Sequence, residues 1–188
     1  MATVLIVFES KYGQTAKIAD TIGATARRGG HEVRVRHVAD LGAGEIAGND
    51  VVAVVAPIYF SRHTRTMLGF VREHAAELSK VPRSAFFSVS NSAASREPLG
   101  REQAQRLAAT LPADVGWNPH LVATAGGALA YPRYGFFTRF VMKRIARSKG
   151  EPVDTEHVHE LTDWAKLDRD VHTMLAPYEA KSELAASA

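Results

Sequence analysis

Runs of apolar residues separated by short polar loops dominate the pattern of this sequence. Residues 3–8 (TVLIVF) and 50–57 (DVVAVVAP) are almost wholly apolar and rich in β-branched side chains. Such runs are typical of strands that are covered on both faces within a parallel sheet. Further strands are predicted at residues 31–38, which alternate as an edge strand does, and at 84–89 and 121–125.

Between these strands, apolar residues recur at helical spacing. The spacing predicts helices at residues 16–28, 67–78, 100–111 and 163–175, and the first of them stops at Gly29 and Gly30. Five strands that alternate with helices predict an α/β fold. We expect a doubly wound, five-stranded, mostly parallel sheet with right-handed crossovers and helices on both faces.

The chain is long enough for one substantial core. Its 188 residues, 46% of them hydrophobic, predict a single domain over residues 1–178, with an insertion at 131–156. The last residues, 179–188, are expected to form a disordered tail. The chain contains no cysteine, which excludes disulfides, thiolate metal sites and cysteine nucleophiles.

The sequence also predicts where the protein works. Its N-terminal apolar run has no basic residues before it and is too short to span a bilayer. No later run reaches the roughly 18 apolar residues that a transmembrane helix needs. We therefore expect a cytoplasmic protein whose contact with a membrane, at its inner face, is peripheral.

Positive charge is concentrated in residues 131–149 (YPRYGFFTRFVMKRIARSK). This segment carries six lysines and arginines and no acid, whereas the whole chain has a net charge of +3. A helix from about Phe136 would place Phe137, Val141 and Ile145 on one stripe and the basic residues on another. That pattern favours binding to an anionic membrane surface or partner over binding to nucleic acid. The alternative is that the basic residues simply form a face exposed to solvent.

The first strand is followed by a loop suited to phosphate. The sequence SKYGQT at 10–15 joins an apolar strand to a helix through hydroxyl residues and one glycine. Backbone N–H groups at a helix N-terminus, with hydroxyl donors, can hold an anion. The chain has no G-x-G-x-x-G here and no Walker lysine, so a mononucleotide is favoured over a dinucleotide or a P-loop NTPase. A plain strand-to-helix turn is the alternative.

Two sequence features resemble a known family. The loop SKYGQT is similar to the flavodoxin phosphate loop, with Tyr12 in place of a small hydroxyl residue. Residues 127–155 (GALAYPRYGFFTRFVMKRIARSKGEPVDT), followed by TDW at 162–164, resemble the menaquinone-dependent protoporphyrinogen IX dehydrogenase family. These are long-chain flavodoxin-like proteins with a basic insertion after the fifth strand. The resemblance extends from the first strand to the last helix and implies a flavodoxin-like fold that binds FMN.

The resemblance also implies which residues serve the cofactor and the substrate. The expected FMN contacts are Ser10, Tyr12, Gly13, Gln14, Thr15, Pro57, Ile58, Tyr59, Phe60, Ser61, Ser88, Val89, Ser90, Asn91, Ser92, Gly126, Gly127 and Ala128. The expected substrate or membrane contacts are Tyr131, Arg133, Tyr134, Arg139, Lys143 and Arg147. For Tyr131 and Tyr134, packing onto the domain is an equally good explanation.

The implied activity is electron transfer through FMN from a porphyrinogen-like substrate to a menaquinone-type acceptor. The alternatives are a flavodoxin that carries electrons between proteins and a quinone reductase with another substrate. The chain departs from the family pattern at Ala130, where a basic residue is usual, and in the loop after Val89, so the substrate is the less specific part of the inference.

Histidines offer few candidates for catalysis. His63 lies in a predicted flavin loop and could move a proton, but a solvent-facing loop histidine is the simpler interpretation. His157 and His159 lie near Asp154 and Glu156 without a distant partner at a suitable spacing, so no metal site is expected.

Overall fold

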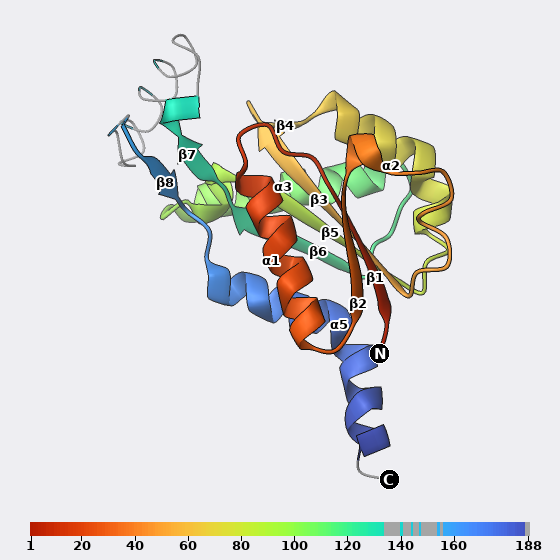
Figure 1. Cartoon of the computed structure of the whole chain (residues 1–188). Helices are drawn as coiled ribbons and strands as arrows, with labels where there is room; N and C mark the ends of the chain where they lie inside the picture. Colours follow the sequence, from red (N-terminus) through yellow and green to blue (C-terminus); the bar gives the residue numbers. More distant parts are fainter. Residues whose placement is uncertain (134–139, 141–143, 145–146, 148–153, 155, 187–188) are drawn as a thin grey trace.

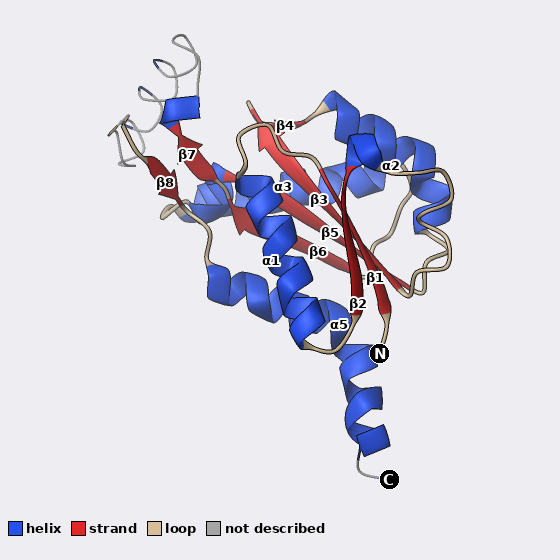
Figure 2. Ribbon diagram, viewed as in Figure 1, coloured by secondary structure: helices blue, strands red, loops and turns tan. Residues whose placement is uncertain are grey.

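The architecture is a parallel sheet between two layers of helices (Figures 1 and 2), as a computed structural model of the chain shows. The structure describes residues 1–133, 140, 144, 147, 154 and 156–186. The five parallel strands stand in the order β2 (Glu32–His37), β1 (Thr3–Phe8), β3 (Val51–Tyr59), β5 (Arg83–Ser90) and β6 (Leu121–Gly126). A short strand, β4 (Arg62–His63), pairs antiparallel with the end of β3. This flavodoxin-like arrangement confirms the predicted fold class.

Helices cover both faces of the sheet, and two apolar clusters hold them there. On one face, α1 (Gln14–Arg28) and α5 (Trp164–Ala186) pack through Ile18, Ile22 and Leu167. On the other, α2 (Arg65–Leu78) and α3 (Pro98–Asp114) pack around Trp117 and Phe86. The central strands β1 and β3 contribute alternate residues to both clusters, which explains why their sequences are continuously apolar.

A hairpin interrupts the regular alternation after β6. Strand β7 (Ala128–Ala130) pairs antiparallel with β8 (Val158–Glu160), with Leu129 opposite His159. A short 3-10 helix, η3 (Tyr131–Arg133), follows β7. Earlier in the chain, the structure describes two further 3-10 helices, η1 (Val38–Asp40) and η2 (Asn91–Ala94). Figure 1 shows the hairpin projecting beyond the sheet, close to the first turn of α1. The sequence did not predict these strands.

Most of the predicted basic helix lies outside the described residues. Within 134–153, the structure describes Phe140, Arg144 and Arg147 as helical and exposed. The predicted apolar stripe of Phe137, Val141 and Ile145 is outside the described residues. At the other end of the chain, α5 continues to Ala186, where the sequence predicts a disordered tail from 179. Among the described residues, no helix is long and apolar enough to cross a bilayer.

Candidate cofactor site

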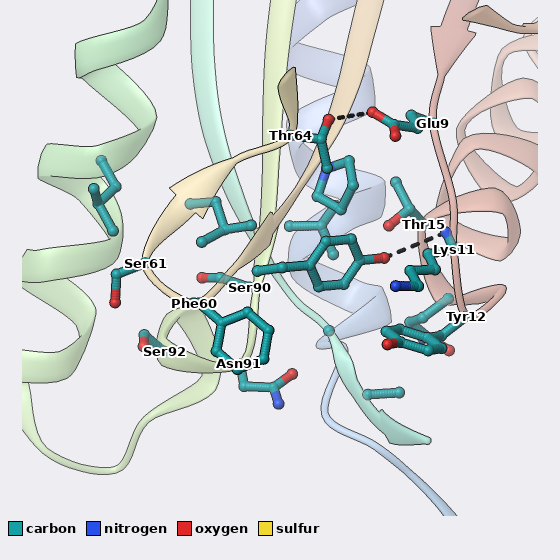
Figure 3. A pocket seen from close by; sticks show the side chains of 18 of the residues that line it. Glu9, Lys11, Tyr12, Thr15, Phe60, Ser61, Thr64, Ser90, Asn91 and Ser92 are labelled. Atoms are coloured by element: carbon teal, nitrogen blue, oxygen red, sulfur yellow. Dashed lines mark hydrogen bonds between the residues drawn. The ribbon is translucent and has the colours of Figure 1, made fainter. Parts of the chain in front are cut away.

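A cavity of about 750 Å³ opens at the carboxyl ends of the parallel strands. Ligands of doubly wound sheets bind at this edge, because loops from neighbouring strands converge there. Four loops form the walls (Figure 3): those after β1, β3 and β5, and the segment between β6 and β7. The residues that line it are Glu9, Lys11, Tyr12, Gln14, Thr15, Pro57, Ile58, Tyr59, Phe60, Ser61, Thr64, Arg65, Val89, Ser90, Asn91, Ser92, Leu107, Gly127 and Ala128.

The loop after β1 presents a helix N-terminus to the cavity. Gly13 precedes α1 with φ 96°, a left-handed conformation that glycine adopts readily. Its backbone N–H donates to Ser10 Oγ over 3.1 Å. No side chain of the described residues caps α1, so its first N–H groups are available to an anion. Ser10 and Gly13 shape the loop and are not among the lining residues.

Two residues of this loop are also attached to the β7–β8 hairpin. Gln14 lines the cavity, but its Nε2 donates to Thr162 Oγ1 over 2.9 Å. The Thr162 hydroxyl in turn donates to the carbonyl oxygen of Gly126 over 2.7 Å. Tyr12 packs against the buried cluster of Leu129, Ala130 and Tyr131. The Gln14 amide is therefore committed to the hairpin, and its backbone N–H is the group left for a ligand.

The loop after β3 supplies the aromatic wall. The Tyr59 hydroxyl accepts a hydrogen bond from Lys11 N over 3.3 Å, and its ring meets that of Tyr12 edge to face at 5.5 Å. Phe60 and Ser61 form the turn into β4 with φ angles of 50° and 61°. Left-handed conformations cost residues with a Cβ roughly 1–2 kcal/mol each. The turn leaves Phe60 74% exposed at the cavity (Figure 3).

Sequence reasoning missed five lining residues. Glu9 and Thr64 are joined by a short hydrogen bond from the threonine hydroxyl to the carboxylate, drawn in Figure 3, which ties the first two loops together. Thr64 also accepts from Met67 N and caps α2. The other three are Lys11, Arg65 and Leu107. Glu9, Lys11 and Thr64 lie in the loops that follow the predicted strands at 3–8 and 50–57, so strand position alone could have suggested them.

The loop after β5 forms the third wall. Val89, Ser90, Asn91 and Ser92 line the cavity, as expected for a wall. The Ser90 hydroxyl accepts from Ala93 N and so fixes the start of η2. Ser88 does not line the cavity: it is 1% exposed, and its Oγ has no hydrogen-bond partner among the described residues. Ser88 is on the same strand face as Ser90, but it lies two residues further from the end of β5, inside the sheet.

Gly126 and Gly127 allow close approach of different parts of the chain. Gly127 and Ala128 line the cavity, and a Cβ on Gly127 would lie 2.8 Å from Asn91 Oδ1. A Cβ on Gly126 would lie only 2.1 Å from the carbonyl oxygen of Leu161. The close backbone approach that glycine permits at 126 is therefore to the chain after β8 and not to a ligand.

His63 is half-buried, and it is not among the lining residues. Its Nε2 lies 3.3 Å from the carbonyl oxygen of Leu107, and its ring packs against Phe86 at 5.4 Å. Burial lowers the pKa of His63 below its ordinary value. These contacts favour a packing role for the side chain over the solvent-facing interpretation, and proton transfer by His63 stays a prediction.

The residues expected to contact substrate or membrane differ in burial, and some of them lie outside the described residues. Tyr131 is fully buried with Leu129 and Ala130, and its ring lies 6.2 Å from that of His159. Its burial favours packing of the hairpin onto the domain, the alternative explanation, over contact with substrate or membrane. Arg147 is exposed, and Arg133 lies in η3. Tyr134, Arg139 and Lys143 are outside the described residues.

Comparison with known proteins identifies the family. A model of the flavodoxin domain matches residues 5–156, and this chain belongs to that family. Its relatives include the protoporphyrinogen IX dehydrogenase (quinone) of Escherichia coli strain K12, 31% identical over 163 residues that cover 87% of this chain and 89% of that protein. The Leishmania major protein of the same name is 33% identical over 171 residues, 88% of this chain and 71% of that protein. The family predicted from the sequence is confirmed.

Solved structures support the fold alone. A flavodoxin from Streptococcus pneumoniae TIGR4 superposes with a TM-score of 0.57 and 16% identity, covering 94% of this chain and 99% of that chain. The rubredoxin oxygen:oxidoreductase of Desulfovibrio gigas gives a TM-score of 0.59 and 14% identity, covering 95% of this chain and 36% of that chain.

Family membership implies FMN as the cofactor, and the cavity has the parts that FMN requires. An uncapped helix N-terminus with Lys11 beside it suits a phosphate. Tyr59 and Phe60 provide aromatic surface for a planar ring system. The volume is within the range of cofactor sites. The predicted cofactor thus fits the residues present.

Proposed function

We propose that this chain is an FMN-dependent oxidoreductase of the protoporphyrinogen IX dehydrogenase (quinone) type. It would take electrons from a porphyrinogen-like substrate and pass them to a menaquinone-type acceptor. The observation that carries the proposal is the match to the Escherichia coli and Leishmania major enzymes, at 31% and 33% identity over 87% and 88% of the chain. The cavity at the carboxyl edge of the sheet supports it by accommodating FMN.

In this proposal the loop after β1 holds the phosphate. Ser10 and Gly13 set the loop conformation, and the N–H groups of Gln14 and Thr15 point the positive end of α1 at the anion. Lys11 adds a cation beside them. Tyr12 closes the loop against the hairpin, since its ring packs there.

The remaining walls hold the isoalloxazine ring. The residues proposed to border it are Pro57, Ile58, Tyr59, Phe60, Ser61, Val89, Ser90, Asn91, Ser92, Gly127 and Ala128. FMN, when bound, supplies the chemistry of accepting a hydride and releasing its electrons to the quinone. The protein's own part is to orient the reactants and exclude water. Glu9 is the one carboxylate among the described lining residues, and Thr64 fixes it by donating to Oε2.

We further propose that the protein acts in the cytoplasm and at the inner face of the membrane, where a lipid-soluble quinone resides. The six cations of 131–149 support this, because each lysine or arginine near an anionic surface contributes about 1 kcal/mol. Replacing Arg139, Lys143 and Arg147 by glutamate should abolish sedimentation with anionic liposomes and leave FMN bound. Equal sedimentation of this variant and the unaltered protein would remove the membrane from the proposal.

The activity is tested by steady-state turnover under anaerobic conditions. Protein loaded with FMN should convert protoporphyrinogen IX to protoporphyrin when a menaquinone analogue is present, and protein stripped of FMN should not. Exchange of electrons with redox proteins, without oxidation of the porphyrinogen, would favour an electron-carrier flavodoxin. Reduction of the quinone only with a different donor would favour a quinone reductase of another substrate.

A further inference from the structure

Two arginines flank the aromatic wall of the cavity. Arg62 is in β4, and Arg65, the first residue of α2, lines the cavity itself. Arg62 is paired directly opposite Tyr59 across the antiparallel ladder. Directly paired residues point to the same face of a hairpin, so Arg62 shares the face of Tyr59, which is also a lining residue. Arg65 therefore lines the cavity, and Arg62, which is not itself a lining residue, lies on the strand that borders it, opposite the lining residue Tyr59.

Neither arginine has an acidic partner within the described part of the chain. Other exposed cations do: Lys17 pairs with Glu160, and Arg106 with Glu102. Glu9, the one carboxylate among the described lining residues, accepts a hydrogen bond from Thr64 and forms no salt bridge with Arg65. Arg62 and Arg65 are both exposed. They therefore offer two planar donor groups to an anion that enters from solvent.

The turn between Tyr59 and Arg62 adds an exposed aromatic side chain. Phe60 and Ser61 both have left-handed backbone conformations, and Phe60 keeps its large ring 74% exposed. Strained residues at a cavity are a reason to look for function, because packing alone does not favour them. Here the strained turn keeps an aromatic residue exposed at the cavity that Arg65 also lines, two residues before Arg62. Such a surface matches a flat, apolar molecule that carries carboxylates.

We propose that Arg62 and Arg65 form the subsite that binds the propionate carboxylates of a tetrapyrrole substrate. The inference rests on the proposed function, which supplies a substrate of this class. It differs from the sequence-based hypothesis, in which the basic segment at 131–149 attracts those carboxylates. The arginines of β4 and α2 bind the charged edge, and Phe60 contacts the ring. Each guanidinium can donate two parallel N–H bonds to one carboxylate.

The test uses direct binding, so it does not depend on turnover. FMN-loaded protein is titrated with protoporphyrin IX and with its uncharged dimethyl ester, and porphyrin fluorescence is followed. The double variant R62Q/R65Q removes both charges and keeps hydrogen-bonding side chains. R72Q is the matched control, because Arg72 is an exposed arginine further along α2. FMN content and circular dichroism report whether each variant is folded.

The expected result is specific to charge. R62Q/R65Q should bind the diacid about tenfold or more weakly than the unaltered protein, since hydrogen bonds between charged groups are the strong ones. Its affinity for the ester should be unchanged, and R72Q should bind both like the unaltered protein. Equal diacid affinity in R62Q/R65Q and the unaltered protein would overturn the inference. Equal losses for diacid and ester, or an equal loss in R72Q, would overturn it too.

Failure of the proposed function has a different signature. If the unaltered protein binds neither porphyrin, and protoporphyrinogen IX does not reduce its flavin, the proposed function fails and the subsite fails with it. If the unaltered protein prefers the diacid and R62Q/R65Q keeps that preference, only the subsite fails.

Discussion

At the scale of single residues, Gly126 is the described glycine at which an added Cβ would have the closest contact. An alanine Cβ there would lie 2.1 Å from the Leu161 carbonyl oxygen, a backbone atom that cannot move without shifting the chain after β8. We expect Gly126→Ala to lower the free energy of unfolding by about 2–3 kcal/mol, because overpacking against backbone forces a shift. Urea unfolding followed by circular dichroism measures this.

Gly69 provides the matched control. It is exposed in α2, and nothing lies within 4 Å of the Cβ that alanine would add. Gly69→Ala should raise the free energy of unfolding by roughly 0.5–1 kcal/mol, because alanine loses less backbone entropy in a helix. Equal effects of the two substitutions would contradict the assignment of Gly126 to close packing.

His63 predicts a dependence of stability on pH. Burial lowers its pKa in the native state below the ordinary value of 6.5, and this effect outweighs the backbone hydrogen bonds that act in the opposite direction. As pH falls below about 6.5, the unfolded chain binds a proton that the native state does not bind. The free energy of unfolding should therefore decrease on acidification until the lowered native pKa is reached.

His63→Gln isolates this contribution. Glutamine can still donate to the Leu107 carbonyl, but it cannot titrate. Urea unfolding between about pH 8 and about pH 5 should give a shallower loss of stability in the variant than in the unaltered protein. His31, whose pKa burial also lowers, keeps part of the slope in both proteins. Parallel curves would mean that His63 titrates alike in the folded and unfolded states.

At the scale of elements, the β7–β8 hairpin and the phosphate loop form one unit. Tyr12 packs on the hairpin cluster, Gln14 bonds to Thr162, and Lys17 pairs with Glu160. Tyr12→Ser, which restores the small hydroxyl residue usual in such loops, should remove the ring and loosen the hairpin. We expect faster amide hydrogen exchange in β7 and β8, equivalent to about 1–3 kcal/mol of local stability.

The conservative variant Tyr12→Phe controls for this effect. It keeps the ring and should leave exchange in β7 and β8 close to that of the unaltered protein. FMN should slow exchange in both strands, since the ligand contacts one side of the Tyr12 loop and the hairpin contacts the other. Unchanged exchange in Tyr12→Ser would mean that the hairpin is held without the loop.

The sequence predicted elements where periodicity was strong. Both bounds of β1 were predicted correctly. The predicted helices begin two residues after the observed starts of α1 and α2, because Gln14 and Arg65 are polar first-turn residues that carry no periodic signal. The three-residue strands β7 and β8 were missed. Strands so short carry no pattern, and their partners lie far apart in the sequence.

At the scale of the whole molecule, the site is assembled by topology. The order β2-β1-β3-β5-β6 brings the loops after β1, β3, β5 and β6 to one edge, so the sequence could predict the cavity walls from strand ends alone. It could not predict side-chain direction. Ser88 is buried inside the sheet and His63 packs against Phe86, whereas Arg65 lines the cavity, and those outcomes depend on packing partners distant in the sequence.

The central claim is that the cavity holds an FMN that accepts electrons from a porphyrinogen. The most direct measurement is anaerobic mixing of FMN-loaded protein with protoporphyrinogen IX, followed by absorption of the flavin. We predict loss of the oxidised-flavin spectrum as the porphyrinogen is consumed, and its return when a menaquinone analogue is added. A flavin that stays oxidised in the presence of excess protoporphyrinogen IX would contradict the account.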